Sequence, residues 1–165
     1  DIQARAGEAC VVLKGNHEEL MEHADRSAAE RAFWMLNGGK EALRSYGEQR
    51  DLIEPGGAHY RWLKNLPLSY EEGGVFFVHA GLSAANAEEL DPHKLLWERP
   101  PLVRGHFCAV VCGHTPTDSG RVEEKDGVFR CDIGLGYGRQ APFEYLALHA
   151  KENEKLTWEI RTTND

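Results

Sequence analysis

The sequence predicts a single α/β domain over residues 1–165, with a largely antiparallel sheet towards its C-terminal end. Three observations predict this fold class. Helical patterns dominate up to residue 66, short valine-rich apolar runs follow, and the last third alternates apolar and polar residues. The chain shows no internal repeat, low-complexity tract or linker. Such a mixture is typical of one α/β domain.

The first part of the chain is predicted to hold one strand and three helices. Residues 9–13 form a short apolar run with the length and β-branched content of a buried strand. Ser27 and Glu30 have the spacing of a capping box, and the helix that they begin is expected to stop at Asn37-Gly38-Gly39. The predicted helices are 28–36, 40–46 and 59–66.

From Leu68 onwards the apolar pattern changes to that of strands. Residues 71–74 are predicted to form the turn of a hairpin, and Lys125-Asp126-Gly127 the turn of another. The predicted strands are 68–70, 75–78, 109–112, 122–124, 128–131, 145–150 and 156–161. The final third is therefore expected to be a β-meander.

Composition excludes several classes of function. Apolar residues make up 41% and charged residues 28%, which fits a soluble globular domain. A formal net charge of −8 with scattered Lys and Arg argues against a nucleic-acid partner. Apolar runs are far shorter than the ~20 residues that span a bilayer, so no membrane association and a cytoplasmic location are expected. The four cysteines have no Cys-x-x-Cys spacing and are expected to be reduced thiols.

Three predicted strands each end in histidine and glycine. Residues 11–14 run into Gly15-Asn16-His17, 75–78 into His79-Ala80-Gly81, and 109–112 into Gly113-His114. Ligand crevices in α/β sheets lie beyond the carboxyl ends of strands. Imidazole nitrogen and amide oxygen, with no thiolate among them, suit a borderline or hard divalent ion and not a cysteine-rich structural zinc site. The pattern predicts a catalytic metal site; the alternative is that each histidine is a hydrogen-bonded polar residue at a strand end.

Four ordered motifs carry a resemblance that covers nearly the whole chain. They are Leu13-Lys14-Gly15-Asn16-His17-Glu18, Val78-His79-Ala80-Gly81-Leu82, Leu95-Leu96-Trp97-Glu98-Arg99 and Val111-Cys112-Gly113-His114-Thr115-Pro116. The chain resembles the phosphoprotein phosphatase branch of the calcineurin-like metallophosphoesterases, which includes bacterial serine/threonine phosphatases and diadenosine tetraphosphatases. The resemblance implies a sandwich of two mixed β-sheets flanked by helices.

The resemblance also implies roles for five residues. Asn16, His79 and His114 would be ligands of one ion of a pair of divalent metals, Mn or else Fe, Zn, Ni or Mg. His17 would act as general acid on the leaving oxygen while a water activated by the two metals attacks phosphorus. Arg99 would hold the phosphate; the alternative for Arg99 is a surface ion pair with a carboxylate such as that of Glu98.

The sequence departs from the family pattern in its first motifs. Neither Gly-Asp-x-His-Gly nor Gly-Asp-x-x-Asp-Arg-Gly is present, although these supply the remaining metal ligands. Asp91-Pro92-His93 imitates part of the first motif but is interpreted as a coincidence. The domain is therefore expected to be incomplete at its N-terminus, and this chain alone is expected to be inactive, with its full metal pair present only in a longer protein.

Three functions are compatible with these motifs. The leading hypothesis is a serine/threonine protein phosphatase that acts on phosphorylated proteins. An enzyme that hydrolyses dinucleoside polyphosphates such as diadenosine tetraphosphate uses the same metal core, so a nucleotide substrate stays open. A non-catalytic, degenerate phosphatase module is the third, and the missing motifs favour it.

Overall fold

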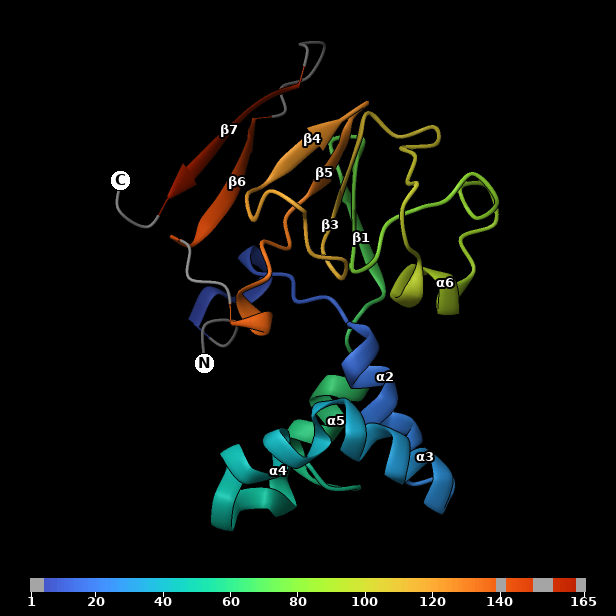
Figure 1. Cartoon of the computed structure of the whole chain (residues 1–165), viewed down its shortest axis with the longest axis vertical. Helices are drawn as coiled ribbons and strands as arrows, with labels where there is room; N and C mark the ends of the chain where they lie inside the picture. The colour runs from blue at the N-terminus through green and yellow to red at the C-terminus, as the bar shows by residue number, and fades with distance from the viewer. Residues whose placement is uncertain (1–4, 139–141, 150–155, 163–165) are drawn as a thin grey trace. The chain divides into compact units, whose positions relative to one another are not determined.

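A computed structural model describes residues 5–138, 142–149 and 156–162, and the chain divides into two compact units, 1–67 and 68–165 (Figure 1). The first unit is helical. Its elements are η1 (Gly7–Ala9), α2 (Asn16–His23), α3 (Ala28–Trp34), η2 (Met35–Gly39), α4 (Lys40–Tyr46), η3 (Gly47–Leu52) and α5 (Ala58–Lys64). Its buried apolar side chains are Leu20, Met21, Ala24, Trp34, Ile53, Tyr60 and Leu66.

The three predicted helices of this unit are confirmed, with shifted ends. The hydroxyl of Ser27 accepts a hydrogen bond from the backbone N–H of Glu30 at 3.1 Å, so the predicted cap begins α3. The helical conformation breaks at Asn37 and Gly38 in the short turn η2, as predicted, and α4 begins at Lys40. The third helix ends at Lys64, two residues before its predicted end.

The predicted strand at 9–13 is wrong. Residues 10–15 have no regular secondary structure, and Val11 is 42% exposed. A strand needs a neighbouring strand to satisfy its backbone groups; here the Lys14 N–H donates instead to the Pro67 carbonyl at 2.9 Å. Apolar, β-branched composition gave the prediction, but pairing decides the structure. Histidine and glycine therefore follow two true strands, not three.

The second unit is built on a five-stranded mixed sheet. Its elements are β1 (Ser69–Glu72), β2 (Val75–Val78), α6 (Pro92–Trp97), β3 (Ala109–Cys112), β4 (Glu123–Lys125), β5 (Val128–Arg130), η4 (Leu135–Tyr137), β6 (Glu144–His149) and β7 (Thr157–Thr162). The strand order is β1-β2-β3-β5-β4, and β6 pairs with β7 in a separate antiparallel sheet. The predicted mixed α/β class is confirmed.

The predicted meander is wrong because β3 is parallel to both of its neighbours. Val110 pairs with Phe76 of β2 on one side and with Val128 of β5 on the other. Parallel neighbours need a long crossover, and the segment between β2 and β3, which contains α6, provides one. The hairpin of β4 and β5 is confirmed, but β5 inserts next to β3 and leaves β4 at the edge.

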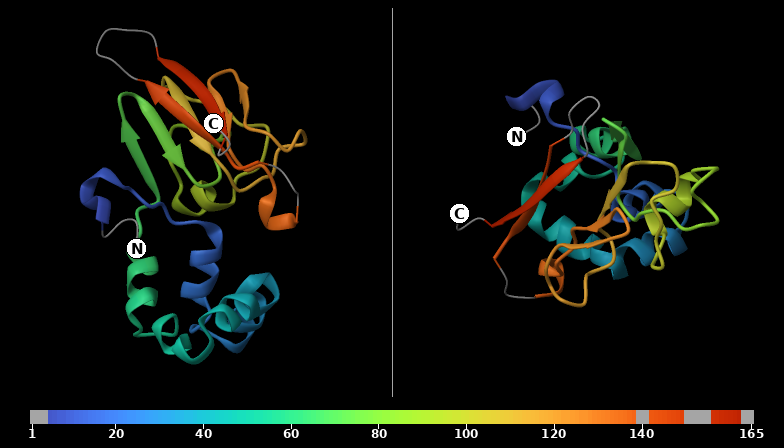
Figure 2. Two further views of the ribbon diagram at one scale, coloured as in Figure 1. Left: turned by 90° about the vertical axis from the view of Figure 1, so that its left-hand side faces the viewer. Right: turned by 90° about the horizontal axis from the view of Figure 1, so that it is seen from above.

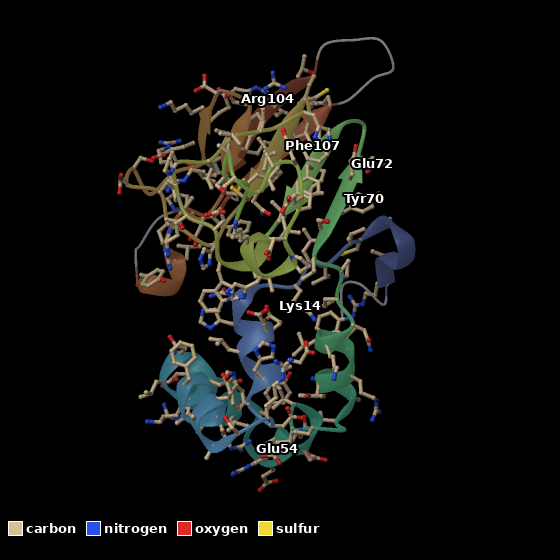
Figure 3. All side chains as sticks on the ribbon, turned by 90° about the vertical axis from the view of Figure 1, so that its right-hand side faces the viewer. Lys14, Glu54, Tyr70, Glu72, Arg104 and Phe107 are labelled. Carbon is tan, nitrogen blue, oxygen red and sulfur yellow. The ribbon has the colours of Figure 1, made fainter. Side chains whose placement is uncertain are left out.

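Each face of the five-stranded sheet has its own apolar layer. On one face, Phe76 and Val110 pack with Leu95 of α6 and with Phe107, whose ring stacks on Phe76 with centroids 4.4 Å apart (Phe107 is labelled in Figure 3). On the other face, Leu146 and Leu148 of β6, together with Leu156 just before β7, pack against the cluster that contains Phe129. Strands β6 and β7 are coloured orange to red in Figure 2. The strands that lead to the candidate site are thus enclosed on both faces.

In the parts of the chain that the structure describes, no helix combines the length and the apolar character needed to cross a membrane.

Candidate metal centre

His79 and His114 meet beyond the ends of two adjacent parallel strands. His79 follows β2 directly, and His114 follows β3 after one glycine. Because β2 and β3 are parallel neighbours, their carboxyl ends lie at the same edge. His79 Nε2 lies 3.2 Å from His114 Nδ1, and the ring centroids are 5.0 Å apart. The parallel pairing therefore brings these two histidines together.

The backbone around the two histidines is tightly determined. Gly113 N–H donates to the His79 carbonyl at 2.8 Å, which ties the two strand ends together. His114 has a φ of 63°, a left-handed conformation that is uncommon for residues other than glycine. Strained conformations of this kind gather at functional sites, where the surrounding structure holds them. Gly81 has a φ of 105°, and a side chain there would lie 2.8 Å from Leu102 Cδ1.

The spacing of the two imidazole nitrogens suits one divalent ion. Two nitrogens bound to the same ion at ~2.1 Å, at an angle between octahedral and tetrahedral, lie ~3.0–3.4 Å apart. The observed separation of 3.2 Å falls in this range. Two imidazoles are only part of a coordination shell, however. Among the described residues, no group of three or more His, Cys, Asp or Glu side chains is arranged to hold a metal.

Arg99 lies beside this histidine pair. It follows α6, and its Nη1 lies 3.5 Å from the hydroxyl of Thr115, the residue after His114. The Glu98 carboxylate has other partners: it accepts a hydrogen bond from the Ser83 hydroxyl at 2.6 Å and from the backbone N–H of Arg99 at 3.3 Å. The exposed guanidinium is therefore directed towards the histidine loop and presents further donors to solvent.

Asn16 and His17 lie in the first unit, at the start of α2. Asn16 is buried, with 6% of its surface exposed, while His17 is exposed. His17 Nδ1 lies 2.9 Å from the carbonyl oxygen of Asn37. Glu18 accepts a hydrogen bond from the backbone N–H of Gly15 at 2.8 Å, which closes the first turn of the helix. Glu18 therefore caps α2.

The five predicted residues therefore fall into two groups, Asn16 with His17 in one unit and His79, His114 and Arg99 in the other. The members of each group lie within the same unit. Their roles as metal ligands, general acid and phosphate-binding residue stay predictions.

Sequence reasoning missed three neighbours of these residues. The rings of Trp97 and His114 are nearly perpendicular, with centroids 6.0 Å apart, and Thr115 contacts Arg99. Both lie inside the quoted motifs, so adjacency to a predicted ligand was the available signal. The third is the Asn37 carbonyl, for which side-chain chemistry gives no signal at all.

The Asp91-Pro92-His93 sequence has a structural explanation. The Asp91 carboxylate accepts hydrogen bonds from the backbone N–H groups of His93 and Lys94, at 2.9 and 3.2 Å, and so caps α6. Pro92 occupies the first turn, where its missing N–H costs nothing. These residues build a helix start.

Comparison with known proteins places this architecture in a family. A search of the curated proteins gave no match. The model of the calcineurin-like phosphoesterase family matches residues 2–140. That match covers both histidine strand ends, Arg99 and the start of α2, and it supports hydrolysis of phosphate esters with divalent metal ions. The chain belongs to the calcineurin-like phosphoesterase family.

Proposed function

We propose that this protein is a metal-dependent phosphatase of the phosphoprotein phosphatase branch, acting on phosphoserine or phosphothreonine in proteins. One observation carries the proposal: His79 and His114 face each other across 3.2 Å at the ends of adjacent parallel strands. Arg99, within reach of the same loop, adds a donor set suited to phosphate. The residues of the four sequence motifs, and their order along the chain, support the choice of branch.

In this proposal each residue has a separate task. His79 and His114 hold one divalent ion, and the family resemblance implies Asn16 as a further ligand. Bound divalent ions supply Lewis acidity towards the phosphoryl oxygens and a water that is easily deprotonated. Arg99 binds and orients the phosphate through its planar fork of N–H donors. His17 donates a proton to the oxygen of the departing serine or threonine, because an alkoxide is a poor leaving group without one.

We further propose that the remaining metal ligands come from a longer form of the protein. The Asp-containing motifs that provide bridging carboxylates in the family are absent from this sequence. Two imidazoles and one amide would bind a divalent ion weakly without a carboxylate, because no negatively charged group would offset the charge of the ion or orient the imidazoles.

The test is phosphatase activity of the protein as encoded, with its upstream coding sequence, alongside the 165-residue chain. The substrates are p-nitrophenyl phosphate, a phosphoserine peptide and diadenosine tetraphosphate, each with Mn²⁺. We expect turnover of the peptide by the longer form, and a loss of about 10²- to 10⁴-fold in His17→Ala. His23→Ala, at the other end of α2, is the matched control and should retain activity.

Other outcomes choose between the remaining hypotheses. Preferential cleavage of diadenosine tetraphosphate would move the protein to the dinucleoside polyphosphate hydrolases. No turnover of any substrate by either form would refute the enzyme and leave a non-catalytic module. Equal activity in wild type and His17→Ala would remove His17 from the mechanism while keeping the hydrolase.

A further inference from the structure

The ring of His17 is held by the backbone of another element of its own unit. Its Nδ1 lies 2.9 Å from the carbonyl oxygen of Asn37. A carbonyl oxygen has no proton to give, so Nδ1 must be the donor in this hydrogen bond. In a neutral imidazole Nε2 is then the nitrogen with the free lone pair. The contact therefore selects one tautomer and one orientation of the ring.

The segment that provides this carbonyl departs from regular helix at the point of contact. Asn37 lies in the turn η2 between α3 and α4, and its φ of −110° and ψ of 45° are not helical. Gly38 follows with a φ of 95°, which glycine adopts without the cost that a Cβ would bring. The irregular dihedrals direct the Asn37 carbonyl to the ring of His17.

A side-chain hydrogen bond fixes this irregular turn. Asn37 Nδ2 donates to the carbonyl of Phe33, four residues earlier, at 2.8 Å. That bond satisfies a carbonyl near the end of α3 and restrains the Asn37 side chain. Gly38 is also close to the ring: a Cβ added there would lie 3.7 Å from His17 Nδ1. His17, Asn37 and Gly38 line one cavity of about 100 Å³.

We propose that Asn37 and Gly38 are positioning residues for the proton transfer by His17. This inference rests on the proposed function. The Asn37 carbonyl holds the Nδ1 proton, so Nε2 is the nitrogen that carries the transferred proton. In the step, the Nε2–H bond breaks and an O–H bond forms on the leaving oxygen, which keeps the electron pair of the broken P–O bond. His17 is left neutral, with its proton on Nδ1.

The contact between His17 and the Asn37 carbonyl lies within the first unit, so it needs no residue from the absent motifs. The consequence is specific. The orientation of His17 should survive in the 165-residue chain without any carboxylate from outside it, and should depend on the conformation of η2.

The first test is spectroscopic and needs no enzymatic activity. Long-range ¹H–¹⁵N NMR of the chain with ¹⁵N-labelled histidine, recorded where the rings are neutral, distinguishes protonation at Nδ1 from protonation at Nε2. The chain has eight histidines, and the signal lost in His17→Gln identifies His17. We expect His17 to be protonated at Nδ1, and we expect Gly38→Ala to reduce that preference. Protonation at Nε2 in the wild type would overturn the proposal.

The second test separates positioning from simple damage to the fold. Gly38→Ala and Asn37→Ala are compared with Gly47→Ala and Asn65→Ala in the longer, active form. Gly47 also has a positive φ, of 55°, but no atom near its missing Cβ, and Asn65 Nδ2 makes the same type of bond to the Arg61 carbonyl on α5. The controls therefore reproduce the strain and the lost hydrogen bond at a different place.

The expected result is a difference between leaving groups. A general acid matters for the serine alkoxide and little for p-nitrophenolate, which departs without a proton. We expect Gly38→Ala and Asn37→Ala to lower kcat about tenfold on the phosphoserine peptide and less than about twofold on p-nitrophenyl phosphate. Both controls should leave the ratio of the two rates unchanged.

The failure of this inference can be told from failure of the proposed function. If His17→Ala shows the leaving-group dependence but the variants of η2 lower both rates equally, the phosphatase stands and the positioning role is refuted. If the longer form hydrolyses nothing, the function fails, and the NMR result alone decides whether the Asn37 carbonyl sets the tautomer of His17.

Discussion

Two cysteines of the second unit should differ in reactivity because their surroundings differ. Cys131 packs beside Phe129 on the face of the sheet covered by β6 and β7, whereas Cys108 is exposed before β3 begins. Burial raises the pKa of Cys131 to about 11 from an ordinary 9.0. Cys131 is therefore expected to react slowly, since the thiolate is the reactive form.

We predict that iodoacetamide at pH 8.5 alkylates Cys108 at least about tenfold faster than Cys131 in the folded protein. The raised pKa keeps Cys131 protonated on folding, so its contribution to stability is intact below pH 9.0 and declines as the pH rises to about 11. Peptide mass spectrometry over time gives both rates. The difference should vanish in urea; equal rates in the folded protein would contradict the assigned burial.

At the scale of elements, local signals were predictable and pairing was not. The Ser27 cap, the helix over residues 40–46 and the valine run of β3 each depend on a few neighbouring residues, and each was found where the sequence places it. Residues 9–13 have the composition of a strand, but composition does not create a partner. The insertion of β5 beside β3 depends on contacts distant in sequence, which periodicity does not encode.

The same contrast between local signals and distant contacts applies to the candidate site. The motifs placed His79 and His114 at strand ends, and the parallel pairing of β2 with β3 then brings their nitrogens to 3.2 Å. The sequence could not predict the partner of His17, because that partner is a main-chain carbonyl exposed by the irregular dihedrals of Asn37 and Gly38. Side-chain chemistry is readable from residue types, whereas main-chain chemistry depends on conformation.

Phe129 of β5 offers a test of the layered sheet. Its side chain is 2% exposed, and its ring meets that of Trp158 from β7 edge-on, with centroids 5.3 Å apart. We predict that Phe129→Ala destabilises this unit by about 3–5 kcal/mol, because it leaves a cavity between the two sheets. Urea unfolding followed by tryptophan fluorescence measures the change.

Phe143→Ala is the matched control for that prediction. Phe143 is the same residue type but is 54% exposed, so its truncation should change stability by no more than about 0.5 kcal/mol. If Phe129→Ala lost as little stability as Phe143→Ala, then β6 and β7 would not cover Phe129 in solution.

For the whole molecule, metal binding should appear as stability. A ligand that binds only the folded state stabilises it by RT ln(1 + [L]/Kd), which is about 1.4 kcal/mol at ten times the Kd. For a chain of this size that corresponds to a rise in Tm of a few degrees. We therefore predict that millimolar Mn²⁺ or Zn²⁺ raises the Tm of the 165-residue chain and that EDTA reverses the rise.

The histidine pair should account for this shift. His79→Ala and His114→Ala each remove one of the two nitrogens that lie 3.2 Å apart, so each should lose most of the metal-dependent rise in Tm. His149→Ala is the control, because His149 is exposed on β6 and contacts Glu159 instead. Differential scanning fluorimetry over a metal titration compares the variants. A shift that survives both substitutions, or that His149→Ala also removes, would place the bound ion elsewhere and leave the pair as hydrogen-bonded imidazoles at two strand ends.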